Sequence, residues 1–211
     1  GVKLQIAEQH LKAGRLPEAE KVLEQAQAMK IDGAKTFLLL TKLRIEQGRL
    51  SEARETIEQA TSFMPTDPEV FYLSGAIEER YGNMDEALSQ YTTATSNAPE
   101  CVDYVMAQGE ALVSLGRLID ALELIESRVA DFDGHAPIHV LAAKVNLMLG
   151  LRSPAVEHAR QAVGLSPDDV TLIADAGWIL VWADECREAI GVLEPLVSEA
   201  STSKTTEAGE I

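Results

Sequence analysis

The sequence repeats one pattern every 34 residues. Glycine recurs at this spacing and is followed five positions later by alanine: Gly14 with Ala19, Gly48 with Ala53, Gly82 with Ala87, Gly116 with Ala121 and Gly150 with Ala155. One further period reaches Asp184 and Ala189, so the alanine persists where the glycine is replaced. A period of this length, kept through six units, is typical of a solenoid whose units pack on their neighbours.

Within one period the pattern predicts two antiparallel helices. In the third unit, Phe71, Ser74, Gly75 and Glu78 follow helical spacing and mark one face of a first helix. A small residue recurs at the Gly75 position in every unit: Ala7, Thr41, Gly109, Ala143 and Gly177. Gly82 is then expected to end the first helix in a backbone conformation that glycine adopts without strain.

The second helix of this unit is predicted to pack closely on the first. Asp85 is expected to cap its N-terminus. Ala87, Tyr91 and Ala94 face back toward the first helix, where the alanines and Gly75 allow close approach. Such a pair carries apolar residues on more sides than it can bury alone, so neighbouring pairs must stack.

These features resemble the tetratricopeptide repeat, whose units have 34 residues and a similar order of small residues, glycine and alanine. The aromatic residue of that pattern is present only as Phe37 and Phe71. Its second alanine is matched by Ala26, Ala60, Ala94 and Ala162. Arg128 and Leu196 replace this alanine, so the fourth and sixth units are expected to pack less regularly.

The resemblance implies an all-α fold, a right-handed α-solenoid of about six antiparallel helix pairs. The expected repeats are 1–32, 33–66, 67–100, 101–134, 135–168 and 169–200. Residues 201–211, "STSKTTEAGEI", are small and polar, and we expect a disordered tail or linker there.

Composition restricts the class of partner. The net charge of −16 opposes binding to nucleic acid, which needs clustered Lys and Arg, and docking on an anionic membrane. No apolar run reaches the roughly 20 residues that cross a bilayer. The chain starts at Gly1 instead of Met, which indicates a truncated N-terminus. We favour a cytoplasmic location, although an exported or periplasmic protein would share these features.

Cysteine and histidine give no clear site. Cys101 and Cys186 lack the spacing of a disulfide framework or a CxxC metal site, so we expect buried or half-buried thiols in a reduced compartment. His135 and His139 are four residues apart, but a proline lies between them, which favours a turn and a solvent-facing histidine. His158 is expected to be an isolated packing or surface residue, and the same holds for His10.

The motifs of common catalytic sites are missing from the sequence. It contains no GxSxG, no phosphate-binding glycine loop and no HExxH. The carboxylates of Glu78 and Glu79, like those of Asp168 and Asp169, are adjacent in sequence, so their side chains diverge. We therefore expect no enzymatic activity, no cofactor and no metal.

The resemblance implies that first helices line a concave groove in which partners bind. Nine residues at groove positions are the candidate binding residues: Lys42, Tyr72, Arg80, Met106, Glu110, Lys144, Met148, Trp178 and Trp182. Leu38 is expected on the same face. Leu38 and Tyr72 stand where a carboxylate clamp of this family would need lysine, and Asn146 falls on the packed face, so the sequence opposes such a clamp.

Trp178 and Trp182 are the only tryptophans and lie four apart, hence on one face of a helix. With Met148 and Lys144 they are candidates for an aromatic pocket that takes a peptide side chain or a cation. The alternative is that these indoles cover apolar surface at the end of the array, or that a later segment buries them. Both interpretations remain open at this point.

The function that follows is a non-enzymatic scaffold that binds a protein or peptide segment in the groove. One alternative is a substrate-docking or regulatory domain of a larger enzyme, since bacterial glycosyltransferases and sulfotransferases carry similar repeats. Another is a homotypic assembly module, because no polar capping helix follows the apolar stretch that ends at Ala200. The identity of the partner does not follow from the sequence.

Overall fold

The computed structural model describes residues 2–194, and its regular secondary structure over this range is entirely α-helical. The chain divides into two compact units, residues 1–111 and 112–211. Helix α7 (Val102–Ser114) spans the division between them. The all-α solenoid fold expected from the repeat is confirmed, whereas the expected repeat boundaries stay predictions and the tail 201–211 lies outside the described residues.

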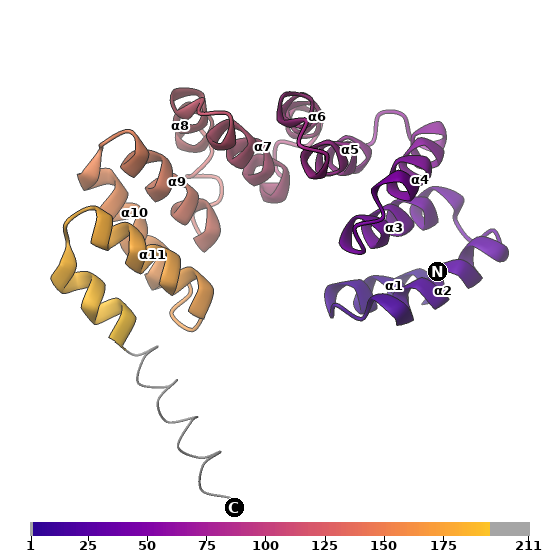
Figure 1. Ribbon diagram of the computed structural model, residues 1–211, viewed down its shortest axis with the longest axis horizontal. Helices are drawn as coiled ribbons and strands as arrows, with labels where there is room; N and C mark the ends of the chain where they lie inside the picture. Colours follow the sequence, from indigo (N-terminus) through magenta and orange to yellow (C-terminus); the bar gives the residue numbers. More distant parts are fainter. Residues whose placement is uncertain (1, 195–211) are drawn as a thin grey trace, which may run out of the picture. The chain divides into compact units, whose positions relative to one another are not determined.

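Unit 1 contains three successive antiparallel pairs of helices followed by the first part of α7 (Figure 1). The pairs are α1 (Val2–Lys12) with α2 (Leu16–Ala28), α3 (Gly33–Glu46) with α4 (Leu50–Phe63), and α5 (Pro68–Arg80) with α6 (Met84–Asn97). Each pair also contacts the next, because α2 packs on α3 and α4 packs on α5.

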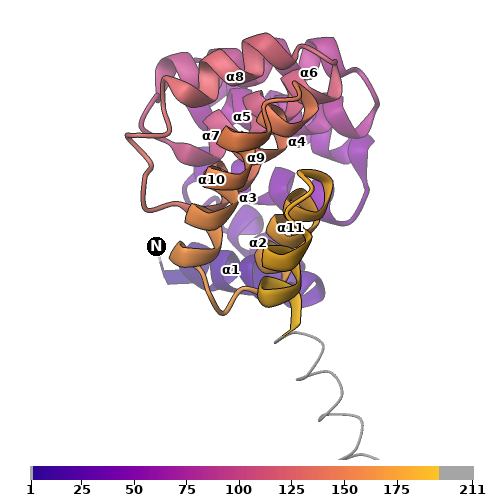
Figure 2. The same cartoon turned by 90° about the vertical axis from the view of Figure 1, so that its left-hand side faces the viewer.

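Unit 2 contains α8 (Leu118–Glu126), α9 (Ala136–Met148), α10 (Arg152–Leu165) and α11 (Val170–Trp182). Residues 186–194 are also helical, up to the end of the described range. Helix α10 packs against both α9 and α11 (Figure 2). Helices α9 and α11 also contact each other. None of the helices over 2–194 is long and apolar enough to cross a membrane.

The repeated glycine marks the turn between the helices of a pair. Gly82 follows α5 with φ of +82°, and the four equivalent glycines also have positive φ. Asp184 holds the sixth position and keeps the same left-handed conformation, with φ of +72°. The turn is short, so α6 begins at Met84 with Asn83 before it. The prediction that Asp85 caps this helix is therefore wrong, because Asp85 already lies within the first turn.

The small residues allow the two helices of a pair to approach closely. A Cβ atom on Gly75 would lie 2.6 Å from the ring of Tyr91 and 3.2 Å from the carbonyl oxygen of Ala87. Ala87 and Ala94 are fully buried, and Tyr91 is nearly so. The predicted packing of α5 on α6 is confirmed, and it explains why the first helix has no side chain at this position.

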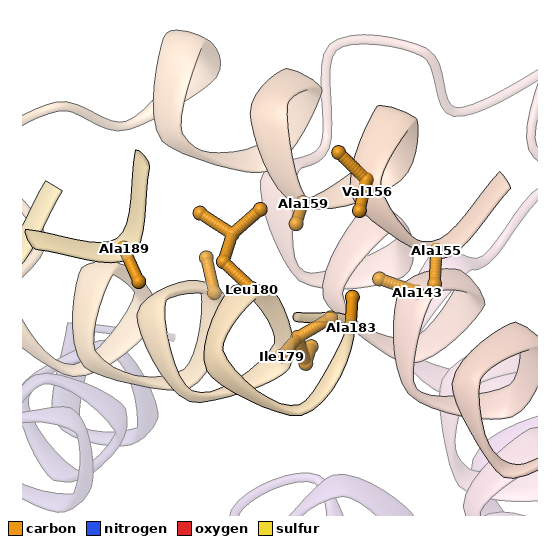
Figure 3. Packing of buried hydrophobic residues seen from close by; sticks show 9 residues of the cluster. Ala143, Ala155, Val156, Ala159, Ile179, Leu180, Ala183 and Ala189 are labelled. Atoms are coloured by element: carbon orange, nitrogen blue, oxygen red, sulfur yellow. The ribbon is translucent and has the colours of Figure 1, made fainter. Parts of the chain in front are cut away.

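The core of unit 2 uses the same small residues. Ala143 of α9, Ala155 and Ala159 of α10, and Leu180 of α11 meet in one buried cluster (Figure 3). Helix α8 departs from the pattern, because it has 9 residues where the other complete second helices have 13 or 14. It ends at Glu126, before Arg128 occupies the usual alanine position. The other expected irregular position, Leu196, lies outside the described residues.

Candidate interaction surfaces

The candidate residues belong to the exposed sides of first helices, which we call the first-helix face of each unit. In unit 1 this face is formed by α1, α3 and α5 with the start of α7; in unit 2 it is formed by α9 and α11. Unit 1 holds Lys42, Tyr72, Arg80, Met106 and Glu110. Unit 2 holds Lys144, Met148, Trp178 and Trp182. The two faces differ in charge and polarity.

Several charges on the first-helix face of unit 1 pair with each other. Lys42 of α3 forms an ion pair with Glu69 of α5. Glu8 of α1 lies 3.5 Å from the ammonium of Lys12 and 3.8 Å from that of Lys35. The Glu8–Lys35 and Lys42–Glu69 pairs join successive first helices, whereas Glu8–Lys12 lies within α1, so part of the charge on this face is already neutralised within the unit.

Tyr72 is packed between two other tyrosines. Its ring centroid lies 5.8 Å from that of Tyr91 and 5.1 Å from that of Tyr104. The hydroxyl of Tyr91 donates to Oε2 of Glu79 at 2.6 Å. Burial raises the pKa of Tyr72, and nearby carboxylates, first Asp103, add to the rise. Tyr72 is half-buried, and it connects α5, α6 and α7 within unit 1.

The remaining candidates of unit 1 vary in exposure. Arg80, the last residue of α5, and Glu110 of α7 are exposed, whereas Met106 is half-buried. Leu38 is only 4% exposed and packs in a core cluster with Val70 of α5. The prediction that Leu38 lies on the open face is therefore wrong: this position points at the neighbouring first helix.

Unit 2 presents an apolar first-helix face. On α11, Trp178 is 62% exposed and Trp182 is 73% exposed, and Val170 and Val181 are also exposed. On α9, Met148 is 51% exposed. Met148 and Trp182 occupy the same position of successive periods, and α9 contacts α11. No ring contact joins the two indoles within the described residues.

Elsewhere in unit 2, large exposed apolar side chains occur one at a time. They are Ile119 of α8, Leu151 before α10, Leu165 at the end of α10 and Ile190 in the last described helix. The exposed middle of α10 is polar. Single exposed apolar residues are ordinary, whereas a group of them on adjacent helices is typical of an interaction surface.

Carboxylates surround the tryptophans along the chain. Between residues 168 and 185 there are five acidic residues and no Lys or Arg: Asp168, Asp169, Asp175, Asp184 and Glu185. All five are exposed. Asp175 lies three residues before Trp178 and therefore on the same side of α11. Lys144 of α9 is also exposed. It is basic and occupies, in the preceding repeat, the position that Trp178 holds in this one.

A histidine pair lies inside unit 2. His139 is 5% exposed, and its Nδ1 lies 3.2 Å from Nδ1 of His158 in α10. Its Nε2 lies 3.1 Å from the carbonyl oxygen of Asp133, in the segment between α8 and α9. Burial and the neighbouring His139 lower the pKa of His158. The expectation of a solvent-facing His139 is therefore wrong, whereas His158, expected to be a packing or surface residue, is half-buried and packs on His139.

An ion cluster in unit 1 also went unpredicted. Glu20 of α2 accepts hydrogen bonds from Arg44, from Gln47 at 2.9 Å and from Arg49 at 2.7 Å. These hydrogen bonds, first that of Arg44, lower the pKa of Glu20 to about 2. Glu52 extends the cluster through a pair of hydrogen bonds with Arg49, each 2.6 Å long. The cluster joins the first two helix pairs at the level of the turns.

The cysteines and acidic groups form no recognisable reactive site in the described part of the chain. Cys101 is half-buried, as expected, whereas Cys186 is exposed, contrary to the prediction. Cys186 begins the helix after α11, where the chain faces solvent. No group of three or more His, Cys, Asp or Glu residues within 2–194 is arranged to hold a metal ion.

Known structures share this fold at low sequence identity. TTC0263, a thermophilic repeat protein of Thermus thermophilus, has a TM-score of 0.72 and 18% identity, with 85% of this chain and 97% of that chain covered. PilW, a type IV pilus biogenesis factor, has a TM-score of 0.79 and 15% identity, with coverage of 93% and 91%. A repeat protein of Parabacteroides merdae has a TM-score of 0.70 and 16% identity, with coverage of 94% and 80%. These likenesses establish the fold alone.

Sequence comparison identifies the family. No curated protein matches this chain significantly. Two family profiles, both of the tetratricopeptide repeat, match residues 10–77 and 72–137, and their combined span is more than half of the 211 residues. The family expectation drawn from the 34-residue period is confirmed, and proteins of this fold are interaction scaffolds in general. The chain belongs to the tetratricopeptide repeat family.

Proposed function

We propose that this chain is a non-enzymatic scaffold that binds a peptide or protein segment on the first-helix face of unit 2. Trp178, Trp182 and Met148 are the residues that we expect to contact it. Lys42, Tyr72 and Arg80, on the first-helix face of unit 1, are proposed as separate candidate contacts. The proposal assigns no chemical step to the chain.

The observation that carries the proposal is the concentration of exposed apolar side chains on α11. Both tryptophans of the chain expose more than half of their surface there, and Met148 is exposed at the equivalent position of α9. Exposed tryptophan is costly to leave in water, and it dominates the energy of many protein interfaces. On the face of unit 1, by contrast, several charges, among them Lys42 and Glu69, are already paired with one another.

Selection from a displayed random peptide library, with the full chain as the target, tests this proposal. The affinity of each recovered peptide is then measured for Trp178→Ala, Trp182→Ala and Met148→Ala. The two tryptophan variants should each weaken binding at least about tenfold, because hot-spot truncations cost more than about 1.4 kcal/mol. All three side chains are exposed, so the folded state should persist.

Two matched variants control for the loss of exposed apolar surface as such. Ile119→Ala on α8 and Leu165→Ala on α10 truncate side chains of unit 2 that are also exposed. They should leave affinity within about twofold, since isolated surface contacts carry little binding energy. Recovery of no binding peptide, or equal losses in both groups of variants, would contradict the proposal.

Self-association is the competing use of the same surface. A second copy of the chain that covers Trp178 would make the protein dimeric, and Trp178→Ala would then return it to the monomer in sedimentation velocity. A wild-type chain that stays monomeric at high concentration leaves the face free for another partner, as the proposal requires.

A further inference from the structure

We infer that the partner segment is cationic: it places Lys or Arg side chains next to aliphatic ones against α11. This inference rests on the proposed function and adds the chemical class of the partner. Its basis is the combination of two exposed indoles with carboxylates outside any ion pair on and around the same helix.

The charge on α11 has one sign. Asp175 is its single charged residue, and it is exposed one turn before Trp178. Asp168 and Asp169 precede the helix, and Asp184 and Glu185 follow it. None of these five carboxylates forms an ion pair within the described residues. Asp169 also caps α11 by accepting from the backbone N–H of Leu172, and Asp184 and Glu185 line a pocket with Arg152 and Arg160. Asp175 is therefore the carboxylate on α11 itself that a docking cation would meet.

The aromatic groups favour the same sign of charge. The face of an indole ring attracts a guanidinium or ammonium group, and tryptophan is the strongest of the aromatic side chains in this respect. Trp178 and Trp182 also lie in the last turns of α11, where the carbonyl end of the helix carries partial negative charge. The carboxylate of α11, the indole ring faces and the C-terminal end of the helix thus all attract a positively charged group.

Lys144 is the opposing charge on this face. It is exposed on α9 and occupies the position equivalent to Trp178 in the preceding repeat. Asp175, the two indole faces and the carbonyl end of α11 all favour a cation, and Lys144 opposes them. Lys144 should therefore repel part of a cationic segment, which makes its replacement a useful test in the direction of tighter binding.

The experiment compares three synthetic peptides that differ only in charge. Each has the same leucine spacing and a fluorescent label, and two side chains beside the leucines are both arginine, both glutamine or both glutamate. Fluorescence anisotropy with the full chain gives the affinities. The arginine peptide should bind about tenfold more tightly than the glutamine peptide, and the glutamate peptide more weakly than either. Added salt should reduce the preference, because these charges are exposed.

Variants with opposite changes of charge locate the effect. Asp175→Lys should weaken the arginine peptide about tenfold, and Lys144→Glu should strengthen it a few-fold. Glu157→Gln is the matched control, because it removes an exposed carboxylate from α10 in the same unit, and it should change affinity less than about twofold. All three positions are exposed, so none is needed for packing.

Equal affinity for the three peptides, or an arginine preference that Asp175→Lys leaves intact, would overturn this inference. Library peptides that still depend on Trp178 would in that case leave the proposed function standing. Removal of residues 195–211 tests another occupant: a large gain in affinity for all three peptides would mean that the chain's own C-terminal segment covers α11, which also overturns the inference. Dimerisation through Trp178 would overturn it as well.

Discussion

The Nδ1 atoms of His139 and His158 lie 3.2 Å apart and share one hydrogen between two helices. The carbonyl oxygen of Asp133 can only accept, so Nε2 of His139 carries a hydrogen and donates to it over 3.1 Å. In the neutral pair, Nδ1 of His139 therefore accepts from Nδ1 of His158. Protonation of His158 at its other ring nitrogen, Nε2, leaves these donor and acceptor roles unchanged.

The histidine pair should make unit 2 less stable in mild acid. The pKa of His158 is lowered in the folded state, by burial first and by His139 second, against the weaker opposing effects of Gln161, Glu126 and Glu157. The unfolded chain therefore binds protons more readily once the pH falls below about 6.5. The contribution of neutral His158 to the free energy of unfolding should be fully present above that pH and should be lost as the pH falls below it.

Chemical denaturation between pH 8 and pH 5 measures this effect. His158→Gln should show a smaller fall in unfolding free energy over the interval than the wild type, because the group with the lowered pKa is gone. The exposed Glu157→Gln variant should retain most of the wild-type pH dependence. If the unfolding free energy of His158→Gln depends on pH as steeply as that of the wild type, other groups are responsible.

Gly75→Ala should destabilise unit 1. The new methyl group would overlap the buried ring of Tyr91, a cost of about 1–3 kcal/mol that the better helix propensity of alanine offsets by up to about 1 kcal/mol. Gly164→Ala is the matched control in α10, because nothing lies within 4 Å of the added atom there. Thermal unfolding should show a lower Tm for the first variant and an unchanged or higher Tm for the second.

Asp184→Gly should stabilise the chain by about 0.5–1 kcal/mol. Asp184 holds a left-handed backbone with φ of +72°, which glycine adopts without strain. The reverse change at the third turn, Gly82→Ala, should cost about 1 kcal/mol. Denaturant midpoints of the two variants should move in opposite directions, and a shared direction would contradict the role given to this position.

The Glu20 cluster should add a second pH dependence, in stronger acid. Because arginine hydrogen bonds lower the pKa of Glu20 to about 2, the folded chain keeps this carboxylate ionised where the unfolded chain protonates it. Its contribution is complete above about pH 4.3 and is lost as the pH falls toward 2. Glu20→Gln should reduce the fall in Tm between pH 5 and pH 3, whereas an identical fall in the variant would refute the assignment.

Sequence reasoning predicted what the period determines. Gly82 and its equivalents recur because each turn needs a left-handed residue, and Ala87 and Ala155 recur because each helix pair needs close packing. These constraints are local to one unit, so they can be recognised along the chain without coordinates. The prediction also extended correctly to Gly75, whose neighbour Tyr91 lies in the same unit.

The features that sequence reasoning missed depend on contacts between helices. His139 and His158 are 19 residues apart, and only the packing of α9 on α10 brings their rings together. Leu38 and Tyr72 share a repeat position, yet Leu38 fits beneath the next first helix while the larger Tyr72 stays half-buried. Exposure of Trp178 and Trp182 could not be read from their spacing, because it depends on what covers α11.

The emission of the two tryptophans gives the most direct test of the proposed binding face. They are the only tryptophans of the chain and both lie on α11, so their fluorescence reports on that face alone. A selected peptide without tryptophan, titrated into the full chain, should shift the emission to shorter wavelength and saturate with the affinity found independently. Saturable binding that leaves the emission spectrum unchanged would contradict the account.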